Sequence, residues 1–495
     1  MGEMMKKKNL ISSGLALVSI FSLTLYSQTG HANDEFQQWM QQQSSDVAVQ
    51  KTEFQEYKDK RDKEFTSFLK AQWKAVDIVK GEVRDEVPKP IIMPMASLQP
   101  VVVAPAAKPV TVTIPEPVFT KPVVVPVVVA PKGSPVDIDF YGRELTFYYD
   151  DHLKHRLNSP INKEAVSNYW SILSRADYED LLKQLQLQKK LLQLNDWAYA
   201  SLISKITLKI DDNHRNESAL LSWFLLAKSG YRARIAYNSA AIYLLIPSEQ
   251  EMFEVTYFTF NGKRYYAAEF EGGKQAPGKV FTYDGEYPET TKDFDMRINA
   301  VEASSNQDAR RHLSFEFEGN KYNIEVSYDR GRIKFLNTYP QLSLNFYFGS
   351  DVYKATATPL QQQLAASMKG MSEQQAVNFL LRFVQTSLKY ETDGRQFGEE
   401  NYLFPEETLF YPYSDCEDRA VLFAWLVHSL LNLQVVGLDF PGHVAAAVHF
   451  NEPVKGDSIS HHGKRYVVTD PTYINANAGM TMPDYKQYKP VVISY

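Results

Sequence analysis

Close to its C-terminal end the chain reads Tyr413-Ser414-Asp415-Cys416-Glu417-Asp418-Arg419-Ala420. A strongly apolar helical pattern follows at once, through Val421, Ala424, Trp425, Val427, Leu430 and Leu431. Ser414 and Glu417 have the spacing of a capping box, in which the two side chains bind the free amides at a helix start. The pattern therefore predicts a helix with Ser414 as its N-cap and Cys416 in its first turn.

The residues around Cys416 act on its thiol in opposite directions. The unpaired amides and the positive end of a helix stabilise a thiolate. Three neighbouring acids, Asp415, Glu417 and Asp418, raise the pKa of the thiol through like charge. A cationic histidine close to the sulfur would have to offset these acids.

Two predicted strands after the helix supply a histidine and an aspartate. The first strand lies within residues 442–449 and places His443 beside small residues on one face. The second runs over residues 465–469 and stops at a proline, which leaves Asp470 at its end. The spacing is 27 residues from Cys416 to His443 and 27 from His443 to Asp470, which fits one helix and two adjacent antiparallel strands. A nucleophile, a base and a carboxylate that orients the base are the set needed for covalent acyl transfer.

Each of the three residues alone also has a purely structural interpretation. A single cysteine is often a small core residue, and an Asp-Pro pair is common in turns. A single histidine is often only hydrogen-bonded inside a fold. The order and the contexts of the three together favour the catalytic interpretation.

Taken in order, these contexts resemble the transglutaminase-like superfamily, whose papain-like core uses a Cys, His, Asp triad. The narrower resemblance is to the bacterial transglutaminase-like cysteine peptidases, and it covers about residues 375 to 475. The motifs that carry it are Phe383-Val384-Gln385, Tyr390, Pro405-Glu406-Glu407-Thr408-Leu409, Asp415-Cys416-Glu417-Asp418 and Pro441-Gly442-His443. The resemblance implies that Cys416 is the nucleophile, His443 the general base and acid, and Asp470 the residue that orients the histidine.

The chain departs from the family pattern at two places. The family usually has glycine at the position of Ser414, and it often has an aromatic residue soon after the histidine, where this chain has Val444 and three alanines. Neither departure removes a member of the triad. The resemblance assigns no oxyanion donor beyond the backbone amide of Cys416.

Composition restricts the remaining possibilities. At 495 residues and 44% hydrophobic content, the chain is long enough for two to four domains of roughly 150 residues each. Its one cysteine excludes an internal disulfide, and its net charge of -6 provides no basic surface for nucleic acid. The pair His461-His462 has no second thiol or carboxylate cluster at ligand spacing, and Walker, Rossmann and zincin signatures are absent. We therefore expect no metal and no cofactor.

The N-terminal residues predict export. Lys6, Lys7 and Lys8 precede an apolar run over residues 10–26, and Gly30-His31-Ala32 offers small residues where a signal peptidase reads them. This pattern predicts a signal peptide over residues 1–32. The alternative is an uncleaved membrane anchor, although the run is short for a bilayer span and five serines and threonines interrupt it. We expect a periplasmic or secreted protein, in the envelope of a Gram-negative bacterium, without a stable membrane span.

Two further segments precede the globular body. Residues 33–87 are polar, with Phe65, Leu69 and Trp73 among apolar residues at mostly helical spacing, which predicts an amphipathic helical arm or a helical hairpin. The arm serves packing or self-association, or alternatively it docks a partner protein of the envelope. Residues 88–135 hold 12 of the 25 prolines, alternating with valine runs. They predict an extended, polyproline-like linker that acts as a tether or lies along the body.

The body is expected in two parts, residues 136–350 and 351–495. Residues 161–230 read as helical and residues 231–350 as strands, including a hairpin that turns at Glu318-Gly319-Asn320-Lys321. Ser372 and Gln375 form a capping box that opens another helix. This order predicts an α+β fold rather than regular βαβ alternation. By the resemblance, its core is papain-like, with the cysteine helix packed on an antiparallel sheet that carries the histidine and the aspartate.

The two parts of the body can also be aligned with each other. Trp425 placed over Trp223 brings residues 420–431 over 218–229, and a shift of one residue brings 463–466 over 262–265. In this alignment the triad positions fall opposite His214, Ala241 with Ile242, and Glu269. The alignment predicts that the first part is a degenerate copy of the fold without nucleophile or base. A chance match of helix-then-strand patterns is the alternative.

These observations predict an exported thiol-dependent acyl-transfer enzyme that acts on protein or peptide amides. Water as the second substrate would make it a cysteine peptidase or amidase, and an amine would make it a transglutaminase. Both remain open because the choice depends on how well the acyl-enzyme is shielded from water. The alternative is a non-catalytic transglutaminase-like scaffold or binding protein of the cell envelope, which the acids around Cys416 favour.

Overall fold

The computed structural model describes residues 30–77, 79–82, 89, 92–97, 109–113, 132–270, 279–298 and 308–495, with side chains from Val49 onward. Most of the predicted signal peptide and most of the predicted linker therefore lie outside the described residues. The chain divides into two compact units, Met1–Arg61 and Asp62–Tyr495. Among the described residues, no helix combines the length and the hydrophobicity that crossing a bilayer requires.

A single helix of 42 residues, α2 (Gly30–Ala71), covers the first part of the predicted arm, so no helical hairpin forms between its ends. Its side chains from Val49 to Arg61 are mostly exposed, including Phe54. Beyond Arg61 the helix carries Phe65, which is buried within the second unit with its ring centroid 4.8 Å from that of Trp170. Apolar burial thus begins only near the end of the helix.

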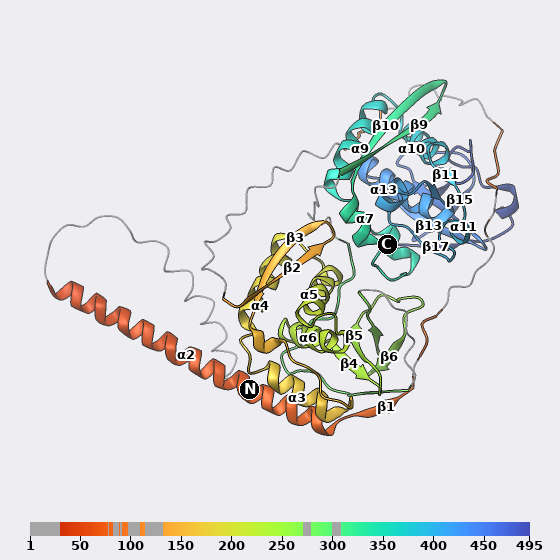
Figure 1. Cartoon of the computed structure of the whole chain (residues 1–495). Helices are drawn as coiled ribbons and strands as arrows, with labels where there is room; N and C mark the ends of the chain where they lie inside the picture. The colour runs from red at the N-terminus through yellow and green to blue at the C-terminus, as the bar shows by residue number, and fades with distance from the viewer. Residues whose placement is uncertain are drawn as a thin grey trace. The chain divides into compact units, whose positions relative to one another are not determined.

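The second unit is an α+β structure with antiparallel sheets, as the order of the predicted elements indicated (Figure 1). Its first part contains β1 (Lys74–Val76), β2 (Ser134–Phe140), β3 (Arg143–Tyr149), the short 3-10 helix η1 (Asp151–Leu153), α3 (Lys163–Leu173), α4 (Glu179–Leu191), α5 (Asp196–Ile210), α6 (Arg215–Lys228), β4 (Arg234–Tyr237), β5 (Ile242–Pro247), β6 (Tyr257–Phe260), β7 (Lys263–Ala267) and β8 (Val280–Thr282).

The part that follows begins with a long hairpin and ends in a second sheet. It contains β9 (Asp308–Phe317), β10 (Asn320–Asp329), α7 (Arg330–Leu336), α8 (Leu344–Phe348), α9 (Lys354–Ser367), α10 (Glu373–Ser387), β11 (Lys389–Tyr390), α11 (Asp393–Gln396), α12 (Pro405–Phe410), β12 (Tyr413–Ser414), α13 (Cys416–Leu431), β13 (Gln434–Phe440), β14 (His443–His449), β15 (Ser458–His461), β16 (Lys464–Thr469), η2 (Pro483–Tyr485) and β17 (Val491–Ile493).

The two larger sheets share one strand order, except that the first sheet has β1 as an additional edge strand. The first sheet is ordered β1-β8-β4-β5-β7-β6, and the second is ordered β17-β13-β14-β16-β15. Five strands follow α6 in the first sheet, and five follow α13 in the second. In each sheet the second of these strands lies between the first and the fourth, and the fifth pairs with the first. Helix α6 packs on β5, and helix α13 packs on β14 in the same position of the order. In each half of the body, a helix thus precedes an antiparallel sheet in the chain and packs on it, and the strands of the two sheets are connected in the same way.

Two local predictions are confirmed in detail. Strands β9 and β10 form the predicted hairpin, with Phe317 paired to Asn320 across a two-residue turn. Both turn residues, Glu318 and Gly319, have positive φ, as the tightest hairpin turns require. Helix α10 begins with the predicted capping box, in which Ser372 Oγ accepts from the amide of Gln375 and the glutamine side chain accepts from the amide of Ser372.

The prediction of strands is wrong at the end of its range. Residues 231–350 were expected as strands, but residues 330–348 contain the helices α7 and α8. Strand β10 ends because the carboxylate of Asp329 accepts hydrogen bonds from the amides of Gly331 and Arg332. An aspartate in this position is a strong N-cap, so it starts a helix where the alternating pattern stops.

The described pieces of the predicted linker lie along the body. The amide of Ala96 donates to the carbonyl of Ile474 at 2.8 Å, the amide of Val110 to the carbonyl of Met371 at 2.9 Å, and the amide of Thr113 to the carbonyl of Leu430 at 2.8 Å. At these residues the chain is an extended strip on the body rather than a free tether.

Candidate active site

Cys416 is the first residue of helix α13, and Asp415 is its N-cap. The prediction that Ser414 is the N-cap is therefore wrong by one residue. Ser414 instead belongs to the short strand β12 and accepts a hydrogen bond from Arg419 Nε at 3.2 Å. Asp418 takes the reciprocal role, because its Oδ2 accepts from the amide of Asp415 at 3.3 Å. Cys416 remains in the first turn, where backbone amides lack partners inside the helix.

His443 and Asp470 are held together by neighbouring strands. His443 opens β14, which pairs with β16, and Asp470 is the residue after β16 ends. His443 Nε2 lies 2.8 Å from Asp470 Oδ2. The other carboxylate oxygen accepts from the amides of Thr472 and Tyr473 at 2.9 and 3.1 Å. The aspartate is therefore fixed on both oxygens and determines the orientation of the imidazole ring.

The histidine strand also reaches the cysteine. The amide of Val444, the residue after His443, donates to Cys416 Sγ at 3.5 Å. With Nε2 bound to Asp470, the other ring nitrogen, His443 Nδ1, is buried and has no hydrogen-bond partner among the described residues. The structure thus brings the three predicted site residues into one cluster, with one ring nitrogen of the histidine left open to exchange a proton.

The cluster is closed to solvent. Cys416 is 0% exposed, and both His443 and Asp470 are 2% exposed. The ring of Tyr485 covers the imidazole, with the two centroids 4.7 Å apart. Gln385 lies beneath the aspartate, where its Nε2 donates to the carbonyls of Asp470, Tyr473 and Ala476 at 3.0, 2.7 and 3.1 Å.

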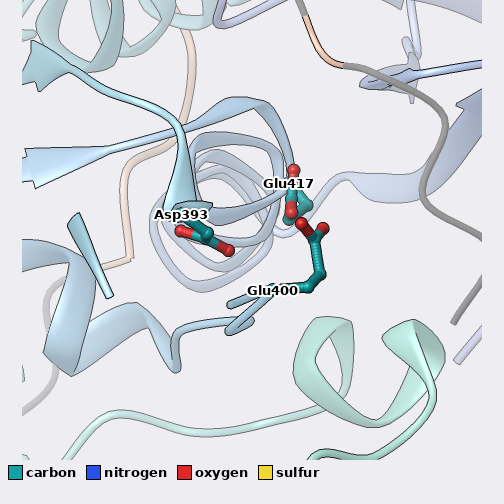
Figure 2. Close-up of side chains that lie close together, drawn as sticks. All are labelled: Asp393, Glu400 and Glu417. Carbon is teal, nitrogen blue, oxygen red and sulfur yellow. The ribbon is translucent and has the colours of Figure 1, made fainter. Parts of the chain in front are cut away.

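A second group of charged residues, which we call the acid cluster, lies beside the thiol. It consists of Asp393, Glu400, Asp415 and Glu417, and Figure 2 shows three of these carboxylates converging. Cys416 Sγ lies 3.1 Å from Glu417 Oε2. The ammonium of Lys89 contacts all four carboxylates, at 2.7 Å from Asp415 and 3.9 Å from Asp393, and it also binds Glu400 and Glu417.

The electrostatics of the thiol follow from this arrangement. Burial, followed by the charges of Glu417 and Asp415, raises the pKa of Cys416 well above its ordinary value, whereas Lys89 and the amide of Val444 lower it. Burial likewise raises the pKa of Asp393 to about 9. Glu417 and Asp415 thus act on the thiol as the sequence predicted, and a cation that opposes them is the ammonium of Lys89.

Carboxylates that converge in this way have the oxygen ligands that hard cations prefer. Asp393, Glu400 and Glu417 place oxygens within 4.8 Å of one another, as do Asp393, Asp415 and Asp418. In this structure the cation among the first three is the Lys89 ammonium. The groups of this kind among the described residues contain no histidine and no cysteine.

Sequence reasoning missed Lys89, Asp393 and Glu400. Lys89 stands between two prolines in the predicted linker, and its partner Glu417 is 328 residues away. Asp393 is the first residue of the short helix α11, and Glu400 follows the end of this helix. Both lie between the motifs on which the family resemblance rests. Charge patterning inside a linker indicates no specific partner, and only the folded chain brings these residues together.

The first half of the body has a cavity at the corresponding place. It has a volume of about 410 Å³ and is lined by the start of α6, the start of β5 and the residues after β7. Arg215 opens the helix and Ile242 opens the strand, where the second half has Cys416 and His443. Glu269, which the sequence alignment set opposite Asp470, lies two residues after the end of β7. This half therefore has no thiol and no imidazole at the matching positions of its elements.

A scan against models of protein families, a search of curated proteins and a search of solved structures each found no match to the chain.

Proposed function

We propose that this protein is a thiol-dependent acyl-transfer enzyme of the transglutaminase-like kind, acting on protein or peptide amides through Cys416, His443 and Asp470. The observation that carries the proposal is the orientation of His443. Its Nε2 is bound to Asp470 at 2.8 Å, its Nδ1 is open, and the next backbone amide donates to Cys416 Sγ. A base held by a carboxylate beside a nucleophile is the arrangement that covalent catalysis requires.

In the proposed reaction, His443 Nδ1 takes the proton of the Cys416 thiol, and the sulfur attacks the carbonyl carbon of an amide. The carbon-nitrogen bond then breaks, and the imidazolium gives its proton to the departing amine. A thioester remains on Cys416. Water or a second amine attacks this thioester with His443 again as the base, which releases an acid or a new amide and restores the thiol. Asp470 keeps the ring in position and stabilises its charged form.

We further propose that the body is a duplicated papain-like module whose first copy has lost its catalytic residues. The shared strand order of the two sheets and the matching positions of α6 and α13 support this. The register offsets between the halves stay near 201 residues, as for Ile242 with His443 and Lys263 with Lys464. Location in the periplasm or outside the cell remains a proposal that rests on the N-terminal sequence alone.

A non-catalytic binding or scaffold role is the second candidate. Burial of Cys416 and the raised pKa of its thiol favour it, because a neutral, inaccessible thiol is a poor nucleophile. In that role the helical arm would hold a partner protein of the envelope.

One experiment tests the choice between the two. The rate of Cys416 alkylation by iodoacetamide is measured against pH in the wild-type chain and in His443→Ala, with His449→Ala as the control because this histidine lies at the far end of β14. An enzyme should lose at least ten-fold in rate below about pH 8 in His443→Ala only. Slow alkylation that is equal in all three chains would contradict activation of the thiol by His443 and favour the scaffold role.

A further inference from the structure

The described part of the linker next to the thiol, residues 89 and 92–97, is called the strap here. It is anchored first by charge. The Lys89 ammonium is bound by the four carboxylates of the acid cluster, two of which, Asp415 and Glu417, flank Cys416 in sequence. Lys89 keeps 13% of its side-chain exposure, whereas Asp415 and Glu417 keep at most 1%. The cluster is thus a pocket for one ammonium group, and the group that fills it comes from a distant segment of the chain.

The strap is anchored secondly by its backbone. Ala96 donates its amide to the carbonyl of Ile474 at 2.8 Å, and Ile474 donates its amide to the carbonyl of Pro94 at 3.1 Å. Met95 forms a parallel bridge with Ile474. Ile474 lies four residues after Asp470, so the strap runs as an added strand beside the loop that holds the triad aspartate. Pairing of this kind recognises an extended backbone whatever its side chains are.

Two side chains complete the fit. Ala96 is buried in a small apolar cluster with Tyr473, Ala476 and Met482, so its methyl group packs against apolar side chains. Met93 Sδ lies 3.1 Å from Arg419 Nη1, on the helix that begins with Cys416. The strap therefore contacts the nucleophile helix, the aspartate loop and the acids beside the thiol.

The lysine serves as a charged anchor. Burial alone would lower the pKa of Lys89, but the charges of Glu417 and Asp415 raise it well above its ordinary value. The amine is therefore protonated and has no lone pair with which to attack a thioester. Its pocket selects a cation by charge and hydrogen bonding.

We propose that the strap occupies a peptide-binding groove of this protein, and that the groove takes an extended peptide with a lysine seven residues before a small residue. The lysine binds in the acid cluster, the backbone pairs with Ile474, and the small residue fits the apolar cluster of Tyr473. The strap is the intramolecular occupant, so an external peptide must displace it. The proposal rests on the proposed function only in treating this groove as the substrate groove of Cys416.

The test frees the groove without altering it. In the full chain with Cys416→Ala, the second substitution Ala96→Asp places a charge in the apolar cluster and should expel the strap, while all residues of the acid cluster remain. Hydrogen exchange of the Ile474 amide, which Pro94 now protects, should quicken at least ten-fold. Ser97→Asp is the control, since it adds the same charge at the next, exposed position and should leave this amide unchanged.

The nine-residue peptide Lys89-Pro90-Ile91-Ile92-Met93-Pro94-Met95-Ala96-Ser97 is then added to the Ala96→Asp chain. It should restore protection at Ile474, and the same peptide with norleucine in place of lysine should need at least ten-fold higher concentration. Equal protection by both peptides, or none by either, would overturn the proposal. So would unchanged exchange in Ala96→Asp.

A folding defect would show as faster exchange throughout β14, and Lys89→Met, which leaves Ala96 in place, then replaces Ala96→Asp with the same expected results. Every measurement uses a chain without the thiol. A failure here therefore leaves the acyl-transfer proposal intact, and a failure of the His443 experiment leaves the groove intact.

Discussion

Substituting Gln385→Leu should both destabilise the second sheet and loosen the triad. The Gln385 side chain is buried in α10, and its amide group donates to three carbonyls in the loop that follows β16, those of Asp470, Tyr473 and Ala476. Leucine fills a similar volume but donates nothing, so buried carbonyls lose their partner. A buried polar group left without a partner costs about 1–3 kcal/mol. Because one amide group serves all three acceptors and the loop can relax, we expect a loss of about 2–4 kcal/mol.

Gln363→Leu is the matched control. Gln363 is also a helix glutamine whose amide binds backbone, donating to the carbonyls of Glu325 and Pro359 at 2.8 and 3.1 Å. Its side chain is half-buried and lies on α9, against the hairpin rather than against the triad. Water can replace its bonds, so we expect a loss of only about 1 kcal/mol.

The assay has two readings. Urea unfolding gives the stability difference, and the rate of Cys416 alkylation against pH tests the proposed activation of the thiol by His443. Gln385→Leu should lower the urea midpoint more than Gln363→Leu and should also reduce the histidine-dependent rate, because Asp470 no longer has a fixed carbonyl. If Gln385→Leu changed stability alone, or no more than its control, the view that this glutamine positions the aspartate loop would be wrong.

Three further predictions concern stability. Burial raises the pKa of Glu407 to about 8. This carboxyl therefore favours the folded chain at low pH, and its contribution to stability is lost as pH rises through about 8. Glu407→Gln should raise the urea midpoint at about pH 9 relative to wild type and not at about pH 5. The buried pair Arg332 and Glu406, 3.3 Å apart, predicts that Glu406→Ala costs about 3–5 kcal/mol, with the double variant that adds Arg332→Met less affected in the same urea assay. A Cβ at Gly437 would lie 2.7 Å from a ring carbon of Phe348, so Gly437→Ala should lower the thermal midpoint at a cost of about 1–3 kcal/mol. Gly394→Ala should not lower it, because a Cβ there would have nothing within 4 Å.

Local sequence determines those parts of the fold whose partners are near in the chain. The hairpin of β9 and β10 follows from alternation and from a turn that needs positive φ at Glu318 and Gly319. The start of α10 follows from a capping box closed within four residues. The same rule failed at α13, because Ser414 has a competing partner in Arg419. A buried arginine that also donates to the carbonyl of Leu388 at 2.8 Å is a tertiary feature, which spacing alone does not contain.

The candidate site divides in the same way. The order of a helix and two strands in 55 residues was enough to predict that Cys416, His443 and Asp470 meet, since adjacent antiparallel strands bring their ends together. Of the acid cluster, the sequence indicated only Asp415 and Glu417, because these two acids are adjacent to the cysteine. The role of Lys89 could not be predicted from the sequence, because the carboxylates that bind this linker lysine lie more than 300 residues away in the chain.

The charges beside the thiol constrain how the site can open. Asp415 and Glu417 are buried, and burial raises the pKa of each while the Lys89 charge lowers it. If the lysine left with nothing in its place, these carboxyls would take up protons or water would have to enter, because isolated buried charges are too costly to keep. If water entered and the carboxyls stayed ionised, the pKa of Cys416 would rise further, since Lys89 is one of the groups that lower it and Glu417 and Asp415 raise it. An opened site that keeps these carboxyls ionised therefore needs another cation in the acid cluster to keep its thiol reactive. A peptide that carries its own lysine meets this requirement while it displaces the strap. Only a positively charged ligand therefore gains access to the groove and replaces the lost ammonium at the same time.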